Sequence, residues 1–160
     1  MGESIVDLGP RPGVRVAARV LLVDPAGRLL LFQGFDPHVP DESFWFTAGG
    51  GLEPGEELLA GAQRELREET GLRGGRWTEL ASFWSSPGFT NERVTVFAAD
   101  GLDEGEPEPD EGEEIELVRW SLREVESRLS ELEDATTLVG LLLYLRAEDP
   151  PGRSDIVAPP

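Results

Sequence analysis

The sequence predicts a mixed α/β fold in which a mixed β-sheet packs between helices. Apolar segments rich in β-branched and aromatic residues recur along most of the chain, one helix-forming segment interrupts them, and two helical segments follow at the end. This order differs from the strict strand–helix alternation of a doubly wound fold. A length of 160 residues, of which 39% are hydrophobic, suits one domain with a sizeable core.

The first strands are expected as a hairpin. Val14–Val23 and Leu29–Gln33 flank Asp24–Gly27, a turn in which proline presets φ and glycine ends the tetrapeptide. Gly34–Glu42 is expected as a loop, and the glycines of Gly49–Gly51 are expected to break regular structure. Further strands are expected at Phe44–Thr47, Arg76–Trp84, Glu92–Ala99 and Ile115–Trp120.

Three helices are expected from composition and capping residues. Glu57–Thr70 is rich in good helix formers and stops at Gly71, which predicts a left-handed C-cap. The two later helices are expected from Ser121, which forms a capping box with Glu124, to about Leu132, and from Asp134 to about Ala147. The predicted domain therefore spans residues 14–147, between a flexible N-terminus at 1–13 and a disordered tail at 148–160.

Composition narrows the class of protein. The chain has 32 acidic and 14 basic residues, a formal net charge of −18, which disfavours nucleic-acid partners because these need a cationic face. It has no cysteine, which excludes disulfides, thiolate nucleophiles and cysteine-ligated zinc. The longest apolar run, Leu141–Leu145, is too short to cross a bilayer, and no secretory leader is visible. These observations predict a cytoplasmic chain without membrane partners.

The first predicted helix carries three carboxylates at one edge of its apolar stripe. The stripe, about 100° wide, consists of Leu58, Leu59, Ala62 and Leu66. Glu65, Glu68 and Glu69 follow the i, i+3, i+4 spacing and therefore share a patch. Arg64 is expected on the far side of the helix, so the patch would need another cation, and a hard divalent ion prefers such oxygen ligands. The alternative is an ordinary solvated helix face.

The segment Gly50–Leu72 resembles the Nudix box, the signature of the Nudix hydrolase superfamily. Nine positions over its 23 residues match: Gly50, Glu56, Arg64, Glu65, Leu66, Glu68, Glu69, Gly71 and Leu72. The resemblance implies an α/β/α sandwich of Nudix type. It also implies a pyrophosphohydrolase that acts on acid anhydrides in phosphorus-containing compounds, with a nucleoside diphosphate linked to another moiety as its substrate.

The resemblance also implies roles for individual residues. The implied metal ligands, for Mg²⁺ or Mn²⁺, are Glu65, Glu68, Glu69 and the backbone of Gly50. Glu65 and Glu68 would be catalytic together with Arg64, which would orient a carboxylate through a charge-assisted hydrogen bond. Glu56 would contact a ligand or position Arg64. Water would attack the diphosphate and, from ADP-ribose, release AMP and a sugar phosphate, so no covalent nucleophile is required.

Two further segments resemble ADP-ribose pyrophosphatases. Pro87 follows Gly71 by sixteen residues, in a segment like the one that marks these enzymes. By this resemblance Pro87, Gly88 and Phe89 would contact the substrate. Residues 103–116 hold nine acids and no base and resemble the loop that supplies a distal glutamate, with Glu113 as the expected base. An ordinary turn and a solvated linker are the alternative interpretations.

The substrate prediction is ADP-ribose or a related nucleotide sugar, a small nucleotide. The approach to the box, Phe46–Gly51, departs from the Leu-Pro-Ala-Gly-like segment common in ADP-ribose enzymes. A nucleoside triphosphate pyrophosphatase, including one that clears oxidised nucleotides, is therefore the alternative enzyme. A non-catalytic Nudix-like nucleotide-binding module is a third hypothesis, which the intact box glutamates disfavour. The sequence does not decide between a monomer and a homodimer.

Overall fold

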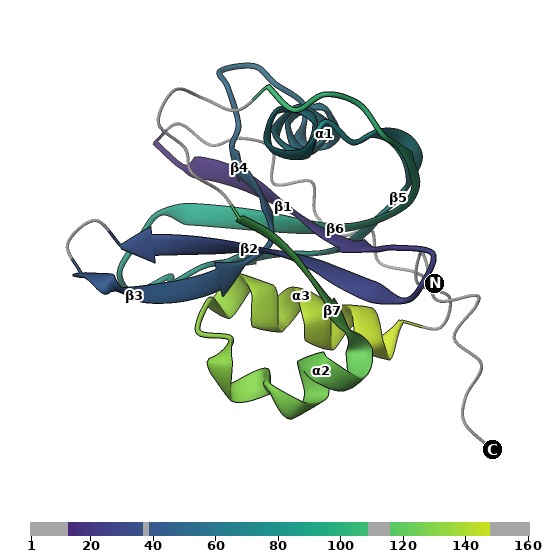
Figure 1. The fold of residues 1–160 in the computed structure, drawn as a ribbon. Coiled ribbons are helices and arrows are strands. Elements are labelled where there is room, and N and C mark those ends of the chain that lie inside the picture. The colour runs from purple at the N-terminus through teal and green to yellow at the C-terminus, as the bar shows by residue number, and fades with distance from the viewer. Residues whose placement is uncertain (1–12, 37–38, 109–115, 148–160) are drawn as a thin grey trace, which may run out of the picture.

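The protein is a seven-stranded mixed sheet covered by helices on both faces (Figure 1). The computed structural model describes residues 13–36, 39–108 and 116–147. The elements are β1 (Arg15–Val23), β2 (Arg28–Asp36), β3 (Val39–Phe46), β4 (Ala48–Gly51), α1 (Leu58–Thr70), β5 (Arg73–Trp84), β6 (Glu92–Asp103), β7 (Glu116–Ser121), α2 (Leu122–Ser127), the 3₁₀ turn η1 (Leu129–Glu131) and α3 (Ala135–Arg146). Helix α1 covers one face, and α2 and α3 cover the other. The predicted layered α/β fold is confirmed, while residues 1–12 and 148–160 lie outside the described residues.

The sheet is mixed because one central pair of strands is parallel. Its main path runs β3-β2-β1-β6-β5, with β4 paired to β1 and β7 paired to β2. Only β1 and β6 are parallel among the described strand pairs. On its other edge, β1 pairs with β4 over Ala17–Val20 and with β2 at Leu22 and Val23. The short strand β4 is therefore held against the middle of the sheet.

Two segments that were expected to be irregular form strands. Gly49–Gly51 belongs to β4 and pairs antiparallel with β1, because backbone hydrogen bonds to an existing strand need no side chain. Gly49 has φ of +129°, and a Cβ there would collide with the carbonyl oxygen of Ala18, so this close approach requires glycine. Within the segment expected as a loop, Gly34–Glu42, β2 continues to Asp36 and β3 begins at Val39.

The helix ends follow the capping residues in most places. Gly71 ends α1 in the left-handed conformation, with φ of 75°. Ser121 and Glu124 form the expected capping box of α2. That helix ends at Ser127 rather than near Leu132, because Arg128 leaves helical geometry and its guanidinium carbon lies 3.8 Å from the centre of the Trp120 ring. The remaining residues reach the core through a 3₁₀ turn.

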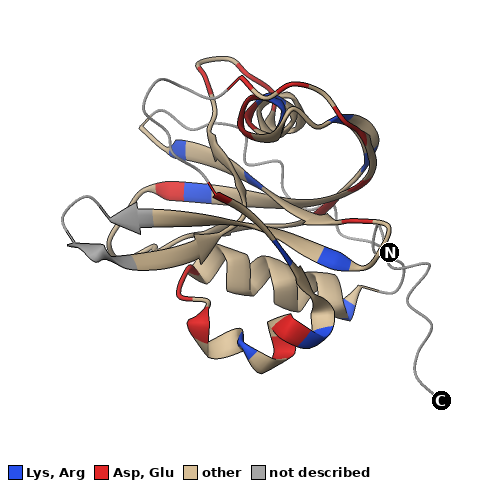
Figure 2. Cartoon of the chain, in the orientation of Figure 1, with Lys and Arg blue, Asp and Glu red and all other residues tan. Residues whose placement is uncertain are grey.

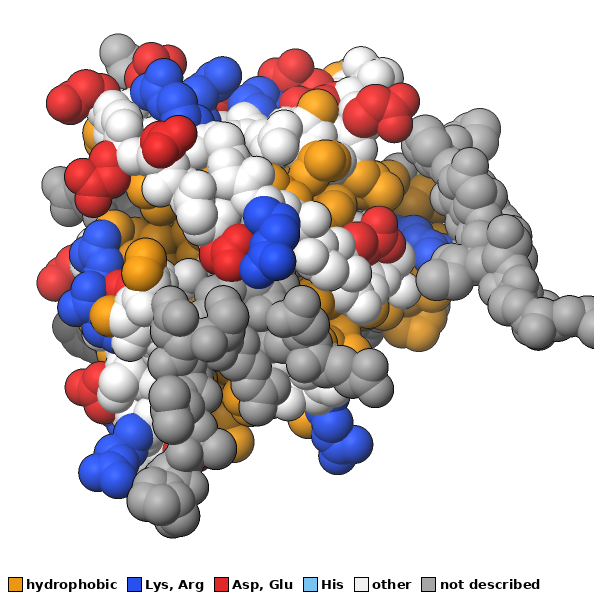
Figure 3. All heavy atoms as spheres, turned by 90° about the vertical axis from the view of Figure 1, so that its right-hand side faces the viewer, with side chains coloured by type: hydrophobic (Ala, Val, Ile, Leu, Met, Phe, Trp, Pro, Cys, Tyr) orange, Lys and Arg blue, Asp and Glu red, His pale blue; other side chains and the backbone are white. Residues whose placement is uncertain are grey.

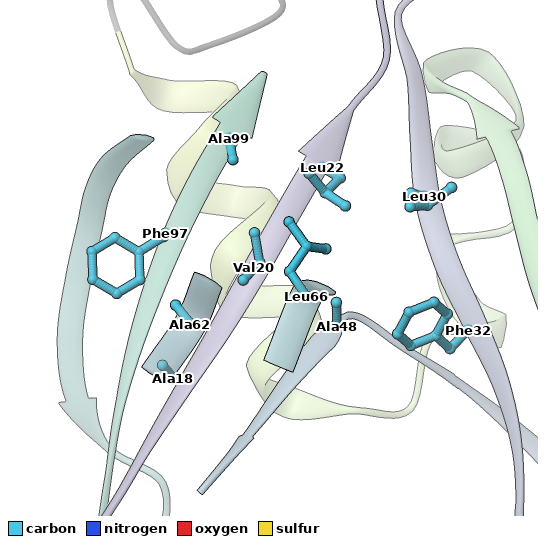
Figure 4. Close-up of a cluster of buried hydrophobic side chains, with 10 residues drawn as sticks. All are labelled: Ala18, Val20, Leu22, Leu30, Phe32, Ala48, Ala62, Leu66, Phe97 and Ala99. Atoms are coloured by element: carbon cyan, nitrogen blue, oxygen red, sulfur yellow. The ribbon is translucent and has the colours of Figure 1, made fainter. Parts of the chain in front are cut away.

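Two apolar clusters hold the layers together. One joins α1 to the sheet through Ala62 and Leu66, which lie over β1 residues such as Val20 (Figure 4). The other lies between the sheet and the C-terminal helices and includes Trp120 and Tyr144. Leu59, expected in the apolar stripe of α1, is 41% exposed, so the buried face of this helix is narrower than the sequence predicts. The packing fixes which side of α1 carries the carboxylates.

Charge is unevenly distributed over this framework. Acidic residues mark α1 and the segment that crosses beside it (Figure 2). On the face shown in Figure 3, arginines are spread between acidic and apolar side chains. No helix within the described ranges is both long and apolar enough to cross a membrane.

Candidate active site

Two carboxylates of α1 lie against the glycines of β4. A Cβ added to Gly50 would come within 2.6 Å of Oε2 of Glu65, so this carboxylate occupies the space in which a side chain would stand. Oε2 of Glu69 accepts a hydrogen bond from the backbone N–H of Gly49 at 3.0 Å. The absence of side chains at Gly49 and Gly50 thus lets the acidic face of α1 approach backbone atoms directly.

Arg64 binds three acidic side chains near the start and middle of α1. Its Nε and Nη2 donate to the two carboxylate oxygens of Glu56 at 2.9 and 3.0 Å, a bidentate geometry. Its Nη1 donates to Glu65 at 2.9 Å and to Glu68 at 3.0 Å. The expectation that Arg64 lies on the far side of the helix is therefore wrong, because its long side chain reaches along the helix surface.

These contacts join the loop before α1 to the helix. Nη2 of Arg64 also donates to the carbonyl oxygen of Gly51 at 3.1 Å, and Glu56 accepts from the N–H of Glu53 at 2.9 Å. The hydrogen bonds to Glu56 raise the pKa of Arg64 above its ordinary value, against the opposing effect of burial. The same bonds lower the pKa of Glu56. Both groups are therefore charged, and they fix the loop between β4 and α1.

The donor set suits a hard divalent cation in its chemistry. Carboxylates and a glycine carbonyl are the oxygen ligands that Mg²⁺ and Mn²⁺ prefer, and the space above Gly50 admits a carboxylate. In the described part of the chain, no group of three or more Asp, Glu, His or Cys residues converges to hold a metal ion. Glu65 and Glu68 are instead directed to Arg64. A metal would therefore take carboxylates that now pair with arginine.

Three of the predicted substrate residues lie together in one turn. Pro87, Gly88 and Phe89 form the turn between β5 and β6, and Phe89 is 92% exposed. Its N–H donates to the carbonyl of Ser86 at 2.8 Å, as does that of Thr90. The structure thus places this segment at the tip of the β5–β6 hairpin.

The acidic segment passes directly beside the box helix. The N–H of Glu108 donates to the carbonyl of Glu68 at 2.8 Å, and Gly105 lies against the backbone of Gly71. The predicted distal base, Glu113, falls outside the described residues. The described part of the segment therefore runs back along α1, from Gly71 at its C-terminal end to Glu68.

Two residues at this site were not singled out from the sequence. Gly49 binds Glu69 through its N–H and accepts a hydrogen bond from Arg19 through its carbonyl. A signal was present, since Arg19 is the only charged residue in the apolar run Val16–Val23. A charged side chain within such a strand needs polar partners.

Comparisons with known proteins identify the family to which the chain is similar. The sequence model of the family described as NUDIX domain matches residues 13–138. An ADP-ribose pyrophosphatase of Bacillus subtilis (strain 168) is 37% identical over 139 residues, which are 83% of this chain and 73% of that protein. An ADP-ribose pyrophosphatase of Mycobacterium tuberculosis is 33% identical over 106 residues, 65% of this chain and 51% of that protein. A crystal structure of an ADP compounds hydrolase superposes with a TM-score of 0.75 at 25% identity, covering 85% of this chain and 74% of that one.

Proposed function

This chain belongs to the NUDIX domain family and is a Nudix pyrophosphohydrolase, and on that premise we propose that it hydrolyses ADP-ribose or a related nucleotide sugar in a metal-dependent reaction. The expected products from ADP-ribose are AMP and ribose 5-phosphate. Similarity to two proteins named ADP-ribose pyrophosphatase supports this choice of substrate.

One observation carries the proposal: the acidic face of α1 is folded onto a strand of glycines. Glu65 lies over Gly50, and Glu69 binds the backbone of Gly49. This arrangement brings carboxylate oxygens and backbone atoms to one place, as a divalent ion that retains waters for a phosphate substrate requires. A helix face that is merely solvated has no need for such contacts.

The metal would be held by Glu65, Glu68, Glu69 and the carbonyl of Gly50. When bound, a divalent ion neutralises charge on the diphosphate and makes water a better nucleophile. For the carboxylates to take it, Arg64 would give up its contacts with Glu65 and Glu68 and keep its bidentate pair with Glu56. Arg64 would then position the loop before α1 rather than compete for the ion.

The reaction is a substitution at phosphorus. A new bond forms between water oxygen and one phosphorus, the bridging P–O bond breaks, and the departing phosphate keeps the electron pair. Glu113 takes the proton of the attacking water in this proposal, and Glu68 stands next to the reacting groups. Pro87, Gly88 and Phe89 contribute to substrate binding from the tip of the β5–β6 hairpin. A carboxylate must reach the attacking water to act as a base.

The partner and location belong to the same proposal. The net charge of −18 supports a small nucleotide over a nucleic acid as substrate. We place the protein in the cytoplasm and include a homodimer in the proposal. Light scattering of the purified chain tests the dimer, and cell fractionation tests the location.

A substrate panel tests the proposed function. Purified protein is incubated with Mg²⁺ and, separately, ADP-ribose, nucleotide sugars, dinucleoside polyphosphates and nucleoside triphosphates, including oxidised ones, and products are separated by chromatography. The highest kcat/KM is expected for ADP-ribose, with activity lost on chelation and restored by Mg²⁺ or Mn²⁺. Preference for triphosphates would replace the substrate assignment, and tight binding without turnover would identify a binding module instead. Activity that survives chelation would show that hydrolysis does not need a divalent metal.

A further inference from the structure

We propose that Arg19 is a positioning residue that holds the glycine strand β4 in place beneath the metal-binding carboxylates. The inference rests on the proposed function, because it concerns the same site. It adds to that function a residue outside the box, on β1, whose guanidinium sets the position of a backbone segment.

The strand β4 cannot hold its own position by packing. Three of its four residues are glycine, and its one side chain is the methyl group of Ala48. Glycine has the largest conformational freedom of any residue, and glycine-rich strands specify their register weakly. Backbone pairing with β1 holds this strand in the sheet, and a further contact from outside that pairing would fix where Gly49 and Gly50 meet Glu69 and Glu65.

Arg19 supplies that restraint directly. It lies opposite Gly49 in the pairing of β1 with β4. Its Nη1 donates to the carbonyl of Gly49 at 2.5 Å and to the carbonyl of Thr47 at 3.3 Å. These two carbonyls flank the start of β4, so one guanidinium fixes the point at which the chain passes from β3 into the glycine strand.

Gly49 is held from both sides of the sheet. Ala18 and Val20 are buried in the cluster that contains α1 residues; because side chains alternate along a strand, Arg19 projects to the opposite face. The carbonyl of Gly49 therefore receives Arg19 from one face, while its N–H donates to Glu69 of α1. The peptide is clamped between a cation and a carboxylate.

The guanidinium of Arg19 binds backbone carbonyls and not carboxylates. It is half-buried, and among the residues that the structure describes it forms no ion pair within 4.0 Å. Acids outnumber bases 32 to 14, so carboxylate partners are plentiful. Placing a charge in a partly desolvated position is costly unless its donors are used. Arg19 uses them on backbone carbonyls, which indicates that holding this backbone is its role.

Loss of Arg19 should act on the metal site before it acts on substrate binding. Without the hydrogen bonds from Arg19, β4 would shift within its pairing with β1. Gly50 would then move relative to Glu65, and the N–H of Gly49 would lose its bond to Glu69. Outer partners that orient metal ligands change metal affinity by about 10- to 100-fold when they are removed. The expected signature is weaker metal binding and lower kcat, with KM for ADP-ribose at saturating Mg²⁺ changed less than threefold.

The test compares Arg19→Met, Arg19→Lys and the control Arg28→Met. Arg28 pairs with Asp24 in the turn between β1 and β2, outside the site. The first readout is amide hydrogen exchange of residues 48–51 without metal, and the second is Mn²⁺ binding followed by electron paramagnetic resonance. Arg19→Met should speed exchange at Gly49 at least tenfold and weaken Mn²⁺ binding about 10-fold or more, Arg19→Lys should recover part of both, and Arg28→Met should match the wild type.

Unchanged exchange at Gly49 and unchanged Mn²⁺ binding in Arg19→Met would overturn the inference. A general loss of folding would also speed exchange in the core of β6, so residues 94–99 serve as the internal reference, and Arg19→Lys provides a folded second variant. The exchange readout does not depend on hydrolysis. A wild-type protein that cleaves no nucleotide would therefore defeat the proposed function, while the exchange data would still decide the role of Arg19.

Discussion

Both carboxylate oxygens of Glu56 accept hydrogen bonds from the guanidinium of Arg64, from Nε at 2.9 Å and from Nη2 at 3.0 Å. This pair joins the loop after β4 to the middle of α1. The side chains are only 14% and 20% exposed, so the pair is better shielded than a surface ion pair. It explains how an arginine within an acidic helix holds the preceding loop.

Replacing Glu56 should lower stability in a pH-dependent way. Arg64 holds the pKa of Glu56 below its ordinary value of 4.5, so folding gains stability when this carboxylate is ionised. That gain is complete above about pH 4.5 and is lost as the pH falls through the lowered pKa. Glu56→Gln should cost about 1 kcal/mol at pH 7 and nothing at a pH below the lowered pKa, measured by urea unfolding.

The control is Glu57→Gln. Glu57 is the exposed N-cap residue of α1, and its side chain makes no capping hydrogen bond. The Glu57→Gln protein should have the same free energy of unfolding as the wild type at both pH values. Equal destabilisation by Glu56→Gln at both pH values would contradict the charge-based account of the pair.

Replacing Glu68 should separate activity from stability. Its carboxylate binds Arg64 but stands beside Glu65, so lost attraction and relieved repulsion largely cancel. Glu68→Gln should lower kcat by about 10²- to 10⁴-fold with a melting temperature within a few degrees of the wild type. Glu57→Gln again serves as the control. Wild-type kcat in the Glu68 variant would remove this residue from the site.

The two glycines of β4 should differ in their response to alanine. In Gly50→Ala the Cβ would meet only the end of a flexible side chain, Glu65, which can swing aside. We expect a loss of less than about 1 kcal/mol in stability and at least a tenfold loss in activity. Gly49→Ala combines a positive φ with a backbone collision and should cost more than about 2 kcal/mol. Paired thermal unfolding and kinetic measurements check this; equal destabilisation by both would contradict it.

Replacing the distal glutamate tests the proposed base. Glu113→Gln should lower kcat far more than it changes KM for ADP-ribose, because a base acts on the attacking water and not on substrate binding. Glu108→Gln is the matched control, since the structure gives the N–H of Glu108, and not its carboxylate, a role beside Glu68. A silent Glu113 variant, alongside an inactive Glu68 variant, would move the base into the box.

The sequence predicts elements well where local signals set them. The capping box of Ser121 and the C-cap at Gly71 depend on residues within one turn, and both are present in the structure. Gly49–Gly51 was expected to be irregular because glycine lacks strand propensity, yet pairing with β1 makes it a strand. Such pairing depends on residues distant in sequence, which local propensity does not reveal.

The same distinction applies to the site. Glutamate spacing on a helix depends on a fixed period, so a shared acidic patch could be predicted. The contacts of Arg64 and Arg19 depend on how far flexible side chains reach and on which backbone lies beside them. Arg64 was therefore placed on the wrong side of the helix, and Arg19 was not singled out. Spacing predicts which groups share a surface, and the tertiary structure decides which of them bind one another.

Hydrolysis of ADP-ribose in ¹⁸O-labelled water, followed by mass spectrometry, tests the central claim most directly. With Mg²⁺, wild-type protein should release AMP and ribose 5-phosphate in equal amounts, with one ¹⁸O in one of the two products, because water attacks one phosphorus of the diphosphate. Failure to cleave ADP-ribose, or cleavage that leaves both phosphates unlabelled, would contradict the account.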